Sequence, residues 1–186
     1  MKKIIALCLI LVMAVGFVAC PKAPVEEAPA VESPLALLES VWALYGDEEK
    51  FALMGGNPEA GVMDAPGAFD MTYAEALASF LQLSAEQVAQ VDEAATMIHM
   101  MNANTFTCGA LRLTEGTDVT AYVEGVRESV QNAQWMCGFP ETLLIANVGG
   151  LVVMAYGAAD LIPVFEGHLT TAYTQAEILV NEAIAG

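Results

Sequence analysis

Apolar residues recur at helical spacing in two long stretches of this chain. In the first, Ser33 and Pro34 have the residue types that begin a helix, and apolar positions continue at helical intervals to Tyr45, just before Gly46. In the second, residues 117–136 place valines and a tyrosine on one side and mostly charged residues on the other. Both patterns predict amphipathic helices.

The stretch between these two helices begins with an irregular segment. Residues 47–69 are rich in Gly, Pro, Asp and Asn, with scattered apolar residues, which predicts a long loop. Thr72 with Glu75, and Ser84 with Gln87, are spaced as capping boxes, in which each side chain satisfies a free backbone N–H at the start of a helix. We therefore expect two short helices after the loop.

Four further segments have the β-branched, aromatic and aliphatic composition of strands. Residues 96–101 and 105–113 are separated by an asparagine-containing turn and are predicted to pair as a hairpin. Residues 142–148 and 151–156 are separated by Gly149-Gly150, and both glycines tolerate the positive φ that a two-residue turn requires. This second pair is the strongest hairpin signal in the sequence.

The chain is predicted to end in a helix or a pair of helices, from about Asp160 through Ala183, with Pro163 in the first turn. After the N-terminal helices, the predicted order is strand, strand, helix, strand, strand, helix. That order predicts an α+β fold, in which an antiparallel sheet of about four strands is covered on one face by helices. We expect residues 35–186 to form this single globular domain.

The first residues have the layout of an export signal. Lys2 and Lys3 form a basic start, and residues 4–18 carry no charge. As a helix this apolar run would be about 22 Å long at ~1.5 Å per residue, short of the ~30 Å of bilayer hydrocarbon that a permanent span must cross. Residues 1–19 are therefore predicted to be a cleaved signal peptide.

The sequence Phe17-Val18-Ala19-Cys20 resembles the lipobox of bacterial lipoproteins, in which small residues precede an invariant cysteine. The resemblance implies that Cys20 is acylated, with chains such as palmitate, and anchors the protein on the extracytoplasmic face of the cell membrane. Phe17 departs from the family pattern, which usually has leucine there. An ordinary secretory signal with an incidental cysteine is the alternative. Residues 20–34 contain four prolines, which is typical of an extended tether.

The chain of 186 residues is 56% hydrophobic, yet its formal net charge is −17, because Asp and Glu number 23 and Lys and Arg only 6. This composition excludes a disordered chain, which needs low hydrophobicity, and a nucleic-acid-binding domain, which needs a basic surface. The acidic surface favours a basic protein or peptide as partner. The alternative is that the charge only keeps an apolar exported domain soluble.

The candidate chemical groups do not form a recognised motif. His99 and His168 have no cysteine or carboxylate at ligand spacing, so both are predicted to be structural or surface residues, and no metal or cofactor is predicted. The glycine pairs do not occur in a phosphate-binding or nucleophile-elbow context. The many carboxylates leave one alternative function open, a small envelope hydrolase with an unrecognised carboxylate or serine site.

The sulfur-containing residues allow two interpretations each. Cys108 and Cys137 are an even pair in an exported domain, and they either form a disulfide or remain as buried thiols that pack like small apolar side chains. Met97, Met100 and Met101 lie in one predicted strand. We interpret these methionines as core residues in preference to a partner-binding surface.

From Phe80 to Leu169 the layout resembles a family of small uncharacterised lipoproteins of Gram-positive bacteria, classified as a domain of unknown function. The resemblance rests on the short helix, Met100-Met101-Asn102, the following strand, the long amphipathic helix and the Gly149-Gly150 hairpin. Family members have more Lys and Glu on that helix and an aromatic residue where this chain has Leu151. The resemblance implies a lipoprotein with an α+β domain and carries no catalytic residues. A membrane-tethered binding domain is the leading hypothesis.

Overall fold

The computed structural model describes residues 31–185. The predicted signal peptide, Cys20 and most of the tether lie outside the described residues. The described part of the chain forms five α-helices, one 3₁₀ turn and eight strands. In chain order these are α1 Pro34–Trp42, β1 Leu53–Gly55, β2 Val62–Met63, β3 Gly67–Phe69, η1 Met71–Tyr73, α2 Ala74–Leu81, α3 Ala85–Val88, β4 Val91–His99, β5 Phe106–Leu113, α4 Val119–Gln131, β6 Thr142–Val148, β7 Leu151–Gly157, α5 Leu161–Ala172 and β8 Glu177–Ala183.

The eight strands form one antiparallel sheet, in the order β2-β1-β4-β5-β7-β6-β8, with β3 also paired to β4. The mixed helix and strand content agrees with the predicted class, but the prediction of about four strands is wrong. The four strands predicted from sequence are the central ones, β4 to β7. The additional strands extend the sheet beyond both β4 and β6, because β1 and β3 pair with β4 and β8 pairs with β6.

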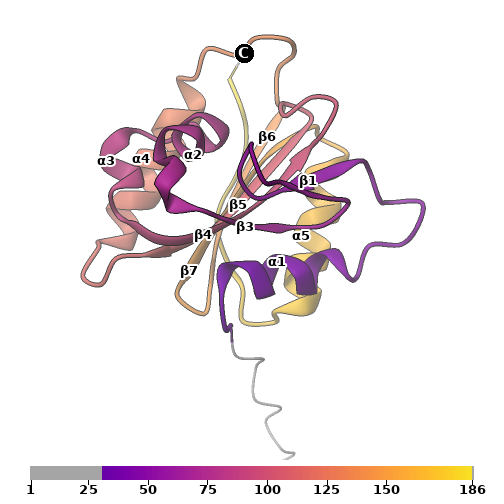
Figure 1. The fold of residues 1–186 in the computed structure, drawn as a ribbon, viewed down its shortest axis with the longest axis horizontal. Coiled ribbons are helices and arrows are strands. Elements are labelled where there is room, and N and C mark those ends of the chain that lie inside the picture. Colours follow the sequence, from indigo (N-terminus) through magenta and orange to yellow (C-terminus); the bar gives the residue numbers. More distant parts are fainter. Residues whose placement is uncertain (1–30, 186) are drawn as a thin grey trace, which may run out of the picture.

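Helices cover both faces of the sheet, with α1 and α5 on one side and α2, α3 and α4 on the other (Figure 1). The prediction of one covered face is therefore also wrong. Successive residues of a strand point to opposite faces, and all seven residues of β7 are buried. Such a strand is a continuous apolar run in the sequence, which is the pattern of a sheet buried on both sides.

The face under α1 and α5 is packed with aromatic side chains. The ring centroids of Trp42 and Tyr45 lie 4.7 Å apart, and the Phe106 ring lies 5.1 Å from Phe51 and 5.6 Å from Phe165. Tilted and edge-to-face ring pairs at such distances contribute about 0.5–1.5 kcal/mol each beyond the area that they bury. This aromatic layer holds both helices against the sheet.

Residues 47–69 do not form the long loop that their composition predicts. Strands β1, β2 and β3 lie in this segment, and β1 and β3 both pair with β4. The glycines that suggested a loop let two strands meet, because a Cβ on Gly55 would lie 2.0 Å from the backbone nitrogen of Gly67. The buried hydroxyl of Thr96 fixes this contact by accepting from the Gly56 N–H at 3.0 Å and donating to the Gly56 carbonyl at 3.1 Å.

The C-terminal segment is a helix followed by a strand, and not the helix or pair of helices through Ala183 that the sequence predicts. Helix α5 ends at Ala172, and β8 pairs with β6, with a bulge at Leu179 where the register shifts. The Gln131 side chain of α4 satisfies backbone groups at the end of β8. Its amide nitrogen donates to the Ala183 carbonyl at 3.0 Å, and its amide oxygen accepts from the Ala185 N–H at 2.9 Å.

The predicted helix starts agree with the structure in two cases out of three. Ser33 caps α1, because its hydroxyl accepts from the Ala36 N–H at 3.1 Å, and the Ser84–Gln87 capping box begins α3. The capping box predicted at Thr72 does not form. Instead, the Asp70 carboxylate accepts from the Thr72 N–H, and a 3₁₀ turn precedes α2.

The hairpin predicted at Gly149-Gly150 is confirmed. The two glycines have φ of 59° and 90°, and they connect β6 to β7. Positive φ at both central residues is the requirement of the turn that matches the twist of two antiparallel strands. The described chain begins beside this turn, since a Cβ on Gly149 would lie 2.8 Å from the Val31 side chain.

Candidate functional site

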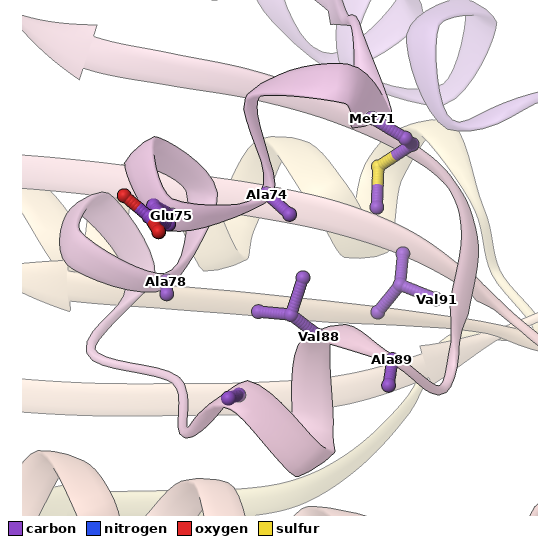
Figure 2. A pocket seen from close by; sticks show the side chains of 8 residues that line it. Met71, Ala74, Glu75, Ala78, Val88, Ala89 and Val91 are labelled. Atoms are coloured by element: carbon purple, nitrogen blue, oxygen red, sulfur yellow. The ribbon is translucent and has the colours of Figure 1, made fainter.

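An apolar groove lies between α2 and α3, on the face of the sheet opposite the aromatic layer. It has a volume of about 360 Å³ and is lined by Met71, Ala74, Glu75, Ala78, Ala85, Val88, Ala89 and Val91. Figure 2 shows the side chains of Met71, Ala74, Val88 and Val91 turned toward the same space. Glu75 is the single charged residue of this lining, and its carboxylate is turned away from Val88 and Val91 (Figure 2).

Small side chains create the groove. Ala74 and Ala78 are four residues apart on α2, and Ala85 and Ala89 are four residues apart at α3, so each pair lies on one side of its helix. A methyl group fills little of the space between two helices. The larger side chain of Val88 is buried and packs with the core below.

Besides Glu75, two carboxylates lie close to residues that line the groove and its neighbouring hollow. A second hollow of about 490 Å³ shares Ala74 and Glu75 with it and continues past Tyr73. The Tyr73 hydroxyl donates to Glu59 Oε2 at 2.9 Å, which raises the pKa of Tyr73 and brings a further carboxylate to this border. The pKa of Asp70 is lowered because its carboxylate accepts from the Thr72 N–H and hydroxyl.

The groove and its border favour one kind of ligand. Among the described residues that line the two hollows, none is Lys or Arg. An apolar group entering the groove would leave water against alanine, valine and methionine side chains. Basic groups on either side of it would meet Glu75, Glu59 and Asp70. This arrangement suits a basic segment that carries an apolar side chain.

Cys108 and Cys137 do not form a disulfide in the structure, because both are free thiols, and they differ in exposure to solvent. Cys108 is fully buried in β5, and this burial raises the pKa of its thiol far above the ordinary value. Cys137 is exposed and follows α4. Cys108 thus has the buried position that one of the two interpretations gave it, whereas Cys137 does not. Cys20, the predicted lipidation site, lies outside the described residues.

The two histidines lie at the margin of the aromatic layer. The ring of His99 stacks on Phe51, with centroids 5.3 Å apart. The ring of His168 lies 4.5 Å from that of Tyr45, and its Nε2 lies 3.1 Å from Glu49 Oε2. Both rings therefore have structural partners, in agreement with the sequence interpretation. Within residues 31–185, no group of three or more His, Cys, Asp or Glu is placed to hold a metal ion.

The methionine interpretation is correct for one of the three residues. Met97 is fully buried in β4, but Met100 and Met101 are exposed. The reason is that β4 ends at His99, so the last two methionines fall in the turn that leads to β5 and not in the strand.

Sequence reasoning missed the groove. Its signal is the repeated spacing of alanines in two consecutive short helices, Ala74 with Ala78 and Ala85 with Ala89. That spacing identifies a side of each helix. Only the structure shows that the two sides border the same hollow, because the chain reverses at Gln82, whose φ is 55°.

Comparison with models of protein families, with curated proteins and with solved structures finds no match. Among residues 31–185, no helix combines the length and the apolar composition needed to cross a membrane.

Proposed function

We propose that this chain is a non-enzymatic, membrane-anchored extracytoplasmic domain that binds a basic protein or peptide through the α2–α3 groove. The observation that carries the proposal is the apolar groove with carboxylates at its border and no cation in its lining. An apolar side chain of the partner enters between Ala74 and Val88. Lysine or arginine residues beside it meet Glu75 and its acidic neighbours.

The size of the groove sets the expected strength of binding. Burying one large apolar side chain contributes about 1.5–3 kcal/mol, whereas a micromolar complex needs about 8 kcal/mol. One anchored side chain is therefore not sufficient, and contacts of the partner with the surrounding surface must supply the rest. Charges at the border contribute mainly to the association rate, which falls as salt shortens their reach to about 8 Å at 0.15 M.

Anchoring is the second part of the proposal. Cys20 becomes the mature N-terminus and carries acyl chains, and the proline-rich residues up to 34 connect it to the domain. Two acyl chains hold a protein on a bilayer firmly, whereas one holds it only marginally. Metabolic labelling with a fatty acid tests this part: the chain should be labelled and its Cys20→Ser variant should not. Equal labelling of the variant would refute lipid attachment at this residue.

The binding proposal is tested with peptides selected by display against the full chain. We expect the selected peptides to pair an apolar residue with Lys or Arg. Two variants then probe the groove: Ala74→Leu fills it, and Glu75→Lys reverses the charge at its border. Each has a matched control on another part of the surface, Ala43→Leu at the exposed end of α1 and Glu128→Lys on the exposed side of α4.

The expected result is that Ala74→Leu and Glu75→Lys each weaken peptide binding at least tenfold while their controls do not. The Glu75→Lys and Glu128→Lys variants change the net charge equally, so they separate a local effect from a general one. Selected peptides that are acidic, or that bind all four variants like the parent chain, would overturn the proposed site.

A further inference from the structure

Sulfur-bearing side chains gather on two adjacent segments at one end of the molecule. We name this surface the sulfur tip and define it by Met100, Met101, Met136 and Cys137. Met101 is 81% exposed and Met136 is 80% exposed, and Met100 and Cys137 are exposed as well. The first two residues belong to the turn between β4 and β5, and the last two follow α4. Both segments lie at the upper end of the view in Figure 1.

Three hydrogen bonds hold the two segments together. The Asn102 side-chain amide donates to the Cys137 carbonyl at 2.8 Å. The Asn104 side-chain amide donates to the carbonyls of Met136 at 2.8 Å and of Gly138 at 3.0 Å. These polar contacts hold the backbones of the two sulfur-bearing segments side by side.

His99 holds the backbone of the turn between β4 and β5. Its Nδ1 faces the backbone N–H groups of Met101 at 3.3 Å and Asn102 at 3.4 Å, and its ring is stacked on Phe51. A ring nitrogen that accepts from backbone N–H groups has its lone pair engaged. His99 therefore acts as a positioning residue for the turn that carries Met100 and Met101.

We propose that the sulfur tip binds a soft monovalent metal ion, Cu⁺ or Ag⁺, through the thioethers of Met101 and Met136 and the thiolate of Cys137. Thioether and thiolate sulfur are the ligands that select Cu⁺ over harder cations. Met100 adds a further thioether beside this set. The inference is independent of the α2–α3 groove, which lies on other residues.

Binding exchanges a proton for the metal ion. The Cys137 S–H bond breaks, the proton passes to solvent, and the sulfur forms a bond to Cu⁺ or Ag⁺. The oxidation state of the metal does not change, so no oxidant or reductant takes part.

The test is isothermal titration of the full chain with Ag⁺, which resists oxidation, followed by anaerobic titration with Cu⁺. The variants are Met101→Leu with Met136→Leu together, and Cys137→Ser alone. Met63→Leu is the matched control, because Met63 is exposed in β2 and lies outside the sulfur tip. Thermal midpoints of all variants verify that folding is retained. Asn104→Ala loosens the two segments without removing a sulfur atom.

We expect the double methionine variant and Cys137→Ser each to lower the affinity for one Ag⁺ equivalent at least tenfold, and Asn104→Ala to lower it by a smaller factor. Met63→Leu should leave it unchanged. If the double methionine variant binds like the parent chain, a cysteine alone captures the metal and the proposed site is refuted. The site is equally refuted if neither variant loses an equivalent.

Discussion

The two faces of the central sheet differ in how their helices pack against it. On one face, α1 and α5 enclose Trp42, Tyr45, Phe106 and Phe165, whose rings contact one another directly or through Phe51. On the other face, the hollow spaces described between α2, α3, α4 and β8 range from about 160 to 490 Å³. The same strands serve both faces, because alternate residues point to opposite sides.

The face under α1 and α5 is closely packed, whereas the face under α2 and α3 carries the candidate binding groove. Aromatic rings fill the space under α1 and α5, and their packing stabilises the domain. Alanines on α2 and α3 leave space, and the buried side chains below them still form a continuous core with Leu81 and Leu111. The hollows are thus surface features above an intact core. Four substitutions test this division, from the largest expected effect to the smallest.

Phe106→Ala should cause the largest loss, about 3–5 kcal/mol of unfolding free energy, because it removes a fully buried ring from the aromatic layer. Urea denaturation followed by fluorescence and circular dichroism measures the loss. Phe139→Ala is the control, since Phe139 is 65% exposed and its removal should change stability by less than about 0.5 kcal/mol. Similar losses for the two variants would contradict the assignment of Phe106 to the core.

Gly109→Ala tests whether the face with hollows is close-packed beneath them. A Cβ at this position would lie 2.5 Å from Leu81 Cδ1, so the leucine must shift. We expect a loss of about 1–3 kcal/mol, as for other overpacked cores, measured by thermal and urea unfolding. Gly167→Ala offers a comparison, because no atom lies within 4 Å of its added Cβ. A neutral Gly109→Ala would mean that the hollows extend to the core.

Ser84→Ala removes the capping box that begins α3. The Ser84 hydroxyl accepts from the Gln87 N–H at 3.2 Å, and the Gln87 side chain accepts from the Ser84 N–H at 2.6 Å. Loss of such a cap costs about 1 kcal/mol. Ser40→Ala is the control, since the exposed Ser40 hydroxyl donates only to the Ala36 carbonyl within α1. Binding of the groove peptides should weaken in Ser84→Ala and remain unchanged in Ser40→Ala.

The smallest expected effect is the stability that the Arg127–Glu182 contact between α4 and β8 loses on acidification. Glu182 Oε1 accepts from Arg127 Nε at 2.8 Å, which lowers the pKa of Glu182 below its ordinary value. A lowered pKa in the folded state contributes stability above the ordinary pKa and loses it as pH falls through the lowered value. Because the pair is partly exposed, we expect about 0.2–1 kcal/mol. Thermal midpoints at pH 7 and pH 3 should differ less in Glu182→Gln than in the parent chain; an identical difference would refute this contribution.

The parts of the fold that the sequence predicts correctly depend on short-range chemistry. Gly149-Gly150 makes a two-residue turn because of backbone freedom at those residues, and Ser84–Gln87 makes a capping box within one helical turn. The amphipathic pattern around 119–131 likewise needs only its own periodicity. Each of these signals is contained within a few residues of the chain.

The missed strands depend on their partners. Residues 177–183 place apolar side chains at spacings that suit either a helix or a strand, and pairing with β6 selects the strand. Strands β1 to β3 are only two or three residues long and owe their form to β4 and to the contact of Gly55 with Gly67. The residues of β1 to β3 do not indicate which strand they will pair with, so the composition of residues 47–69 alone predicts a loop.

The candidate site was hidden for a related reason. Alanines are ordinary helix residues, and Ala74, Ala78, Ala85 and Ala89 form a groove only because the fold brings the two short helices to line the same hollow. The exposed methionines at the sulfur tip were misread because the end of β4 lay two residues earlier than the apolar pattern suggested.

The Gln131 amide covers part of one edge of the sheet, at the end of β8. A strand added to an edge normally presents a new edge of its own, and the addition can repeat from molecule to molecule until a fibre forms. A side-chain amide satisfies the Ala183 carbonyl and the Ala185 N–H with one donor and one acceptor, and it offers nothing to the next chain. In polymer terms the amide caps this end of the edge, and the bulge at Leu179 makes the same strand irregular.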